Sequence, residues 1–116
     1  MTTDALILND PRPLMERLHE WISKADAEVH VEKVLLFGST AKGTRREESD
    51  VDLIVVSESF RGVNDLKRIS ILLRLWSYVE ELNIIAYTPE EFNEAKERFM
   101  VKKALSYAVD LTPSRT

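Results

Sequence analysis

The sequence contains no cysteine and no glutamine among its 116 residues. Without cysteine there is no disulfide framework and no thiolate metal ligand, which excludes both the disulfide-stabilised secreted scaffolds and the zinc-ribbon type of site. No apolar stretch approaches the roughly 20 residues that a membrane-spanning helix needs. The first residues, Met1 to Asp4, lack the basic start and long apolar core of a targeting segment. We therefore expect a cytoplasmic protein that does not associate with a membrane.

The net charge and the length of the chain further limit the class of protein that the sequence can encode. The formal net charge is −4, which disfavours a protein that coats nucleic acid in general, although a local basic segment can still bind phosphate. A hydrophobic content of 44% is enough for a real core. We expect one domain over residues 1–116, in which residues 1–9 and 112–116 form loose tails.

A phosphate-binding turn is indicated by the first part of the stretch from Leu36 to Val56. Residues 34–37 are a short apolar run, typical of a strand buried on both faces, and the run ends at Gly38. Gly38 allows a tight turn and a close approach of the backbone to a ligand. Ser39 adds a hydroxyl at an expected helix start, where backbone N–H groups attract anions, and Gly43 is expected to end this helix. Lys42 adds positive charge, so these residues can hold a phosphate; a solvated basic turn is the alternative for Lys42.

A pair of carboxylates opens the second apolar strand of the same stretch. We expect this strand to begin at Ser49 or Asp50 and to continue through the apolar residues 53–56. Asp50 and Asp52 are two positions apart, so on a strand their side chains share one face. Two carboxylates at the mouth of a buried strand are unfavourable unless a partner compensates them. The natural partner is a divalent cation with oxygen ligands, and Mg²⁺ commonly takes one or two carboxylates with phosphate oxygens and water. An exposed acidic strand end is the alternative.

The combined pattern resembles a known signature. Gly38-Ser39, Gly43, and then Ser49 to Leu53 are similar to the motif of the nucleotidyltransferase superfamily with the DNA polymerase β-like core, and the short length resembles the minimal nucleotidyltransferases. The resemblance implies an α/β fold, in which a small mixed sheet of three or four strands carries the site at one edge and helices pack on it. It also implies that Gly38 and Ser39 bind the triphosphate, and that Asp50 and Asp52 hold Mg²⁺.

Two functions follow from this resemblance. The first is a Mg²⁺-dependent enzyme that transfers a nucleoside monophosphate, AMP from ATP in the first instance, to a hydroxyl acceptor on a partner protein. The second is a catalytically weak or inactive nucleotide-binding subunit that acts as an antitoxin by binding a helical partner of the HEPN type. The chain has no room for a separate acceptor-binding domain, so the acceptor is expected on another chain or across a homodimer.

One position departs from the family pattern. The family carries a third carboxylate on the next strand, a few residues before the segment Tyr87 to Phe92, and this position corresponds here to Asn83. In a two-metal scheme such a carboxylate helps to hold the second ion and activates the attacking hydroxyl. An amide offers an oxygen but no charge, and it is a very poor base. Glu81 would share the face of Asn83 if the strand reaches that far, and it could then substitute.

The other elements follow from periodicity and capping signals. A helix is predicted to start at Asp10-Pro11 and to bury a stripe through Ala25, and strands are predicted within residues 29–37 and over residues 82–87. Thr88 to Glu91 form a capping box. A second long helix is predicted from Asn64, and a final helix is predicted to run to Val109. The apolar stripe expected on the second helix consists of Leu66, Ile69, Leu72, Leu73, Trp76 and Val79.

Overall fold

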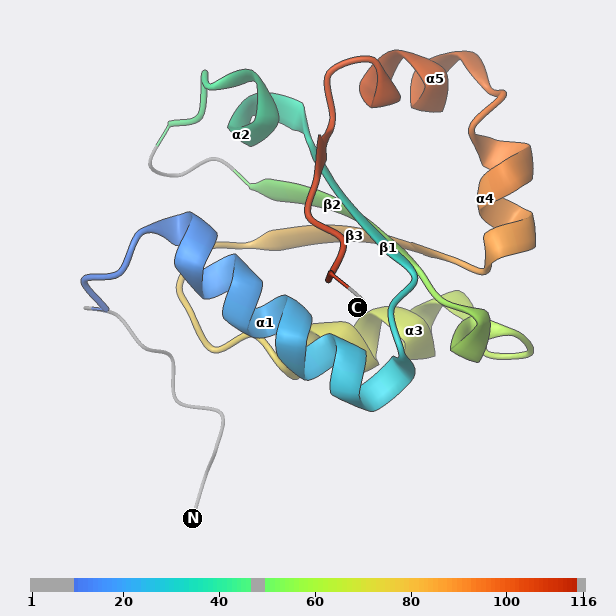
Figure 1. The fold of residues 1–116 in the computed structure, drawn as a ribbon, viewed down its shortest axis with the longest axis horizontal. Helices are drawn as coiled ribbons and strands as arrows, with labels where there is room; N and C mark the ends of the chain where they lie inside the picture. The colour runs from blue at the N-terminus through green and yellow to red at the C-terminus, as the bar shows by residue number, and fades with distance from the viewer. Residues whose placement is uncertain (1–9, 47–49, 115–116) are drawn as a thin grey trace.

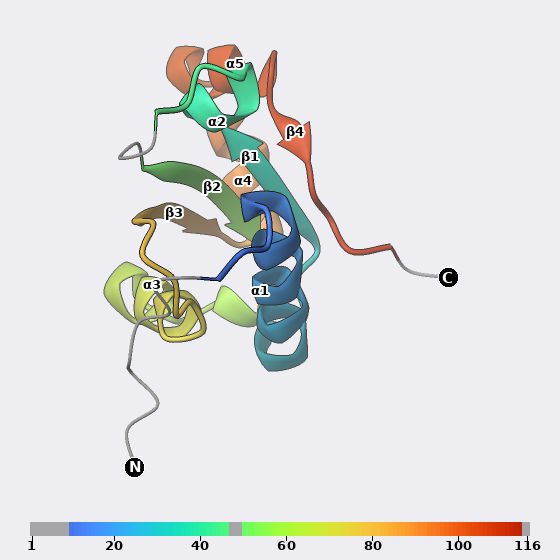
Figure 2. The same cartoon turned by 90° about the vertical axis from the view of Figure 1, so that its left-hand side faces the viewer.

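The computed structural model describes residues 10–46 and 50–114, and within them a four-stranded mixed sheet lies between two groups of helices (Figures 1 and 2). The strand order is β3-β2-β1-β4; β2 pairs antiparallel with β1 and parallel with β3. This confirms the expected α/β fold with a small mixed sheet. In chain order the elements are α1 (Leu14–Val29), β1 (Lys33–Phe37), α2 (Gly38–Lys42), β2 (Val51–Val56), a 3₁₀ turn (Glu58–Phe60), α3 (Asp65–Leu73), β3 (Leu82–Tyr87), α4 (Pro89–Ala95), α5 (Phe99–Leu105) and β4 (Val109–Asp110).

The two faces of the sheet are covered unequally. Because side chains alternate along a strand, Val51, Leu53 and Val55 of β2 face the larger core, which α1 and α3 close. Ile54 and Val56 face a smaller cluster, which contains Phe92 of α4. Figure 1 shows α1 and α3 on one side of the sheet and α4 and α5 on the other. The face toward α4 and α5 therefore packs the smaller of the two clusters.

The first helix begins later than its capping signal suggested. α1 starts at Leu14 with Pro13 at the N-cap, so the predicted start at Asp10-Pro11 is wrong. The Asp10 carboxylate instead accepts hydrogen bonds from the backbone N–H of Arg12, at 2.8 Å, and from its guanidinium, and this Arg12 pairing lowers the pKa of Asp10 to about 2. The predicted apolar stripe is confirmed: Leu18, Trp21, Ile22 and Ala25 are buried, and Leu14, its first member, is half-buried against the same core.

The second long helix is shorter than predicted. α3 ends at Leu73, and Leu66, Leu73 and Val79 of the expected stripe are exposed. Leu72 and Trp76 do enter the core. Asn64 caps the helix as predicted, since its side chain accepts from the backbone N–H of Lys67 at 2.9 Å.

A buried arginine joins α3 to β3 and α4. Arg68 is 5% exposed, and its guanidinium donates to the carbonyl oxygens of Val63 at 2.7 Å and Ala86 at 3.0 Å. It also donates to Glu91 Oε1 at 2.6 Å, and this pairing lowers the pKa of Glu91 to about 2. Glu91 thus serves both in the predicted capping box with Thr88 and in this ion pair. The pattern of residues placed Arg68 off the buried stripe, so its role was not predicted.

The start of β3 is fixed by a second ion pair. Arg17 of α1 donates two hydrogen bonds to the carboxylate of Glu80, each at 2.7 Å, and this keeps the pKa of Glu80 below its usual range. The Trp76 ring nitrogen donates to the Glu80 backbone oxygen at 2.8 Å. These contacts hold the segment that leads into β3, and they thereby set the position of Asn83.

The C-terminal part differs from the prediction in two ways. The helix that follows the capping box, α4, ends at Ala95, and Phe99 and Met100 at the start of α5 are exposed. After α5 the chain forms β4, which pairs with β1, so the predicted helix to Val109 is wrong. Thr112 was predicted to begin a loose tail, but its hydroxyl oxygen accepts from the backbone N–H of Val34 at 3.1 Å. The predicted tail over residues 1–9 and residues 115–116 lie outside the described residues.

No helix in the described part of the chain is both long and apolar enough to cross a membrane.

Candidate functional site

Three neighbouring strand positions bring the predicted site residues into one row. Phe37, the last residue of β1, is paired with Asp52 on β2, and Asp52 is paired with Asn83 on β3. Gly38 follows Phe37 directly and begins α2. The row therefore contains the glycine of the predicted phosphate turn, one aspartate of the pair, and the amide for which the resemblance implies the position of a third carboxylate.

The two aspartates converge on the amide of Asn83. Asn83 Nδ2 donates to Asp50 Oδ2 at 3.1 Å and to Asp52 Oδ1 at 3.2 Å. Alternation along β2 and β3 turns these side chains to the face that α5 covers, because Val51, Leu53 and Ile84 face the larger core. The structure thus brings the two carboxylates together as their spacing predicted, and the roles assigned to them stay predictions.

Two features of this arrangement require glycine at position 38. Its φ is +72°, a conformation that L side chains rarely adopt, and a Cβ atom built on it would lie 2.1 Å from Asp52 Oδ2. The lack of a side chain therefore lets the carboxylate lie against the backbone of the turn. Gly43, with φ +76°, ends α2 as predicted, and its N–H is directed at the Ser39 and Thr40 carbonyl oxygens.

We expect the Gly38→Ala substitution to disrupt the site more than the fold. The new methyl group displaces the Asp52 carboxylate, so nucleotide affinity should fall by at least about tenfold, while the unfolding free energy should fall by about 1–2 kcal/mol from backbone strain. Titration calorimetry with Mg²⁺–ATP and thermal unfolding measure the two effects.

A matched control for this substitution is Gly62→Ala. Gly62 has nearly the same φ, +77°, but a Cβ atom there meets nothing within 4 Å. It should show the same strain with unchanged nucleotide affinity. Equal affinities for the Gly38→Ala variant and the unsubstituted protein would show that the carboxylate does not need this close contact.

The donor set fits a divalent ion held by two carboxylates. One carboxylate oxygen of Asp50 and one of Asp52 accept hydrogen bonds from the same atom, the amide nitrogen of Asn83. Rotation of that amide by half a turn would present Oδ1 as a third, neutral oxygen ligand. Within the described residues no group of three His, Cys, Asp or Glu side chains is placed to hold a metal, so Glu81 does not complete a triad with the two aspartates in this conformation.

A cavity of about 390 Å³ opens beside Gly38 on the same face of the sheet. Its floor is apolar, and α5 forms the opposite wall. Lys42 lies at this cavity with its Nζ 4.5 Å from the centre of the Tyr107 ring. The lining residues are Phe37, Gly38, Lys42, Ile54, Ile85, Met100, Val101, Lys103, Ala104 and Tyr107. The contribution of α5 was missed because its residues were interpreted only as core-facing positions of a final helix.

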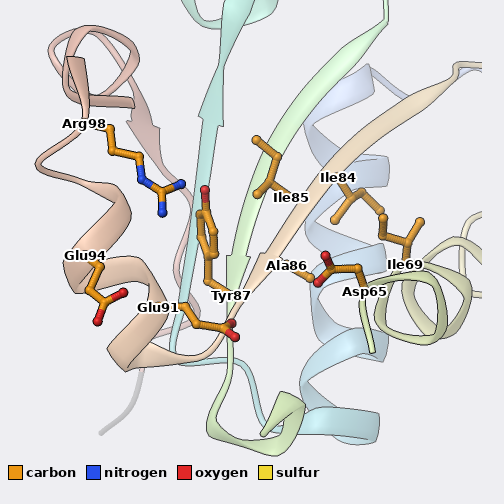
Figure 3. Close-up of a pocket in the computed structure, with 9 residues that line it drawn as sticks. All are labelled: Asp65, Ile69, Ile84, Ile85, Ala86, Tyr87, Glu91, Glu94 and Arg98. Atoms are coloured by element: carbon orange, nitrogen blue, oxygen red, sulfur yellow. The ribbon is translucent and has the colours of Figure 1, made fainter. Parts of the chain in front are cut away.

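A second hollow, of about 290 Å³, follows β3 between α3 and α4 (Figure 3). Figure 3 shows Glu91, Glu94 and Arg98 from the α4 region on one side, and Asp65 from α3 on the other. The lining thus carries three carboxylates against one arginine, and Glu91 is already paired with Arg68. This balance repels a triphosphate, so the hollow beside Gly38 is the better candidate for an anionic ligand.

Comparison with known proteins agrees with the geometry. The family model for the nucleotidyltransferase domain matches residues 16–112, which include both strands of the predicted motif. A search of curated proteins found no match.

Solved structures with related folds include two with TM-scores above one half. A protein from Sulfolobus solfataricus, described as a candidate nucleotidyltransferase, has a TM-score of 0.57 and 21% identity, covering 70% of this chain and 72% of that one. BolA1 from Arabidopsis thaliana has a TM-score of 0.52 and 21% identity, covering 65% of this chain and 94% of that one. These likenesses concern the fold alone.

A third structure, described as a toxin–antitoxin with AMP-PNP, has a TM-score of 0.48 and 14% identity, covering 84% of this chain and 74% of that one, a likeness too distant to bear on function. The family match is different in kind, because it spans most of the chain and contains the Gly-Ser turn and both aspartates. The family's shared activity is nucleotidyl transfer, and its members generally use divalent metal ions. On this match, the chain belongs to the nucleotidyltransferase domain family.

Proposed function

We propose that this protein transfers a nucleoside monophosphate, AMP from ATP in the first instance, to a hydroxyl group on a partner protein, with Mg²⁺ as the metal ion. The observation that supports this most strongly is the convergence of Asp50 and Asp52 on one point beside Gly38. Two carboxylates at that point suit a cation that also binds phosphate oxygens. The proposal of a helical partner of the HEPN type rests on the resemblance to minimal nucleotidyltransferases.

Each residue of the site has a defined task in this proposal. Gly38 and Ser39 bind the triphosphate through backbone N–H groups and a hydroxyl, and Lys42 neutralises part of its charge. Asp50 and Asp52 would hold Mg²⁺, and the bound ion would neutralise charge on the phosphates. The acceptor oxygen forms a bond to the α-phosphorus as the bond from that phosphorus to the β-phosphate oxygen breaks, and pyrophosphate leaves. Catalysis of this kind depends chiefly on positioning and electrostatics.

In the part of the chain that the structure describes, the site has no third carboxylate to accept the proton of the acceptor hydroxyl. Asn83 lies beside Asp52 where a third carboxylate would act as a base, and a neutral amide does not accept a proton at neutral pH. The proton must then pass to Asp52 or to water. This observation favours the second candidate function, in which the protein binds nucleotide and covers a partner with little or no transfer.

A labelling assay separates these two functions. The protein is incubated with Mg²⁺ and ATP labelled at the α-phosphate, alone and with the product of its neighbouring gene. Label that appears on a polypeptide, and is lost both in the Asp52→Ala variant and with EDTA, identifies an active nucleotidyltransferase. ATP binding without label on any polypeptide would contradict transfer to a protein and support the nucleotide-binding subunit.

The Asn83→Asp substitution tests whether the missing carboxylate limits transfer. A third carboxylate supplies a base and a charged metal ligand, so the transfer rate should rise by about tenfold or more at saturating Mg²⁺. The control is Asn93→Asp, which adds the same charge on the exposed surface of α4. An initial rate that does not rise, with Mg²⁺ varied over a wide range, would show that the third carboxylate is not what limits this protein.

A further inference from the structure

The cavity between the sheet and α5 continues directly from the proposed phosphate site. Gly38 and Lys42 belong both to the phosphate turn and to the cavity lining. On the floor, Ile54 is two residues after Asp52 and Ile85 is two residues after Asn83, so these side chains face the same way as the two polar ones. The cavity therefore begins about 7 Å along the strands from the carboxylates, the rise of two strand residues.

The chemistry of the cavity suits a ligand that is anionic at one end and apolar at the other. Phe37, Ile54 and Ile85 form the floor, and Met100 and Ala104 contribute apolar surface from α5. Ligand pockets of this size are mostly apolar with a few placed polar groups. The charged side chains at the cavity are Lys42 and Lys103, and their charge complements phosphate.

From this continuity and charge complementarity we infer that the cavity holds the base of the nucleoside triphosphate, with α5 as the wall that covers it. The inference rests on the proposed function, because the triphosphate anchors the base. Tyr107 and Phe37 offer aromatic surface for the base, and aromatic stacking of a base is worth about 1–3 kcal/mol, or about 5- to 150-fold in affinity. Lys42, which lies over the Tyr107 ring, connects the phosphate turn to the base-binding wall.

The test compares two ligands that differ only in the presence of a nucleoside. Titration calorimetry measures the affinity of Mg²⁺–ATP and of Mg²⁺–tripolyphosphate for the full chain, for Ala104→Trp, and for Lys102→Trp. Ala104 lines the cavity, so the indole fills it, whereas Lys102 is exposed on the same helix and does not line it. We expect Ala104→Trp to weaken ATP binding by about 10- to 100-fold with tripolyphosphate affinity within about twofold, and Lys102→Trp to change neither.

Different failures have different meanings in this design. If Ala104→Trp leaves ATP affinity unchanged, or lowers both affinities equally, the base does not lie in this cavity, while the proposed function stands. If the unsubstituted protein binds neither ligand, the proposed function itself is wrong. Met100→Ala is a second variant that does not threaten folding, since Met100 is 74% exposed. This variant should bind ATP several-fold more weakly than the unsubstituted protein and tripolyphosphate equally well. If the variant and the unsubstituted protein bind ATP with equal affinity, the inference is wrong.

Discussion

Replacing Asp52 with alanine is expected to lower the affinity for Mg²⁺–ATP by at least about 100-fold, because it removes one of the two charged ligands proposed for the metal. The variant should fold normally. Among residues 10–46 and 50–114, only the Asn83 amide donates a hydrogen bond to the Asp52 side chain, and this amide also donates to Asp50. The loss of one of two adjacent carboxylates removes a like-charge repulsion. The melting temperature without ligand should therefore be unchanged or slightly higher.

Calorimetry at fixed Mg²⁺ and a thermal melt measure the two parts of this expectation. The matched control is Asp65→Ala, which removes the same charge from a side chain that is 88% exposed on α3. This control should bind Mg²⁺–ATP with unchanged affinity. If the Asp52 variant also binds normally with Mg²⁺ present, Asp52 is not a metal ligand and the site lies elsewhere.

Replacing Arg68 with methionine is expected to lower the free energy of unfolding by about 3 kcal/mol, because two backbone carbonyl groups lose a charged hydrogen-bond donor and each such bond contributes about 1.5–3 kcal/mol. The buried guanidinium donates to two carbonyl oxygens and to Glu91, and methionine fills a similar volume without any donor. The Ala86 carbonyl loses a buried partner, whereas the Glu91 side chain is 46% exposed and can turn to water. Hence the loss should come chiefly from the carbonyl groups.

Urea unfolding of five proteins separates these contributions: the unsubstituted chain, Arg68→Met, Glu91→Gln, their double variant, and Lys67→Met. Lys67→Met, one residue earlier and exposed on the same helix, is the control and should change stability little. The double variant with Glu91→Gln gives the coupling between the two side chains. A loss below about 1 kcal/mol for Arg68→Met would show that water replaces the guanidinium, and that Arg68 does not hold α3 to β3.

Sequence reasoning succeeded where the signals are local. The bounds of β3, Leu82–Tyr87, and the capping box that follows are as predicted, because an apolar run and a Thr-Pro-Glu-Glu segment act over a few residues. The approach of Asp50 to Asp52 follows from the two-residue period of a strand. Their shared contact with Asn83 needed in addition the parallel pairing of β2 with β3, whereas the family resemblance implied only that the sheet is mixed.

Prediction failed where a long-range contact decided the outcome. The segment from Arg74 to Glu81 contains neither glycine nor proline, so nothing in it marked the end of α3, and the helical stripe was extended too far. The burial of Arg68 depends on a carbonyl group 18 residues later in the chain. The part of α5 in the cavity depends on the return of the chain across the sheet, which a helical period does not reveal.

The unequal covering of the sheet has a consequence for how this protein can diverge. The larger core, which α1 and α3 close, contains neither Asp50 nor Asp52. On the other face of the sheet, no residue of α5 is fully buried. Substitutions on α5 can therefore change what is recognised beside the phosphate turn with little loss of stability, and the Gly38 and Asp52 arrangement can be inherited unchanged. A protein with this arrangement can acquire new ligands by altering one surface helix, because no residue of α5 is fully buried.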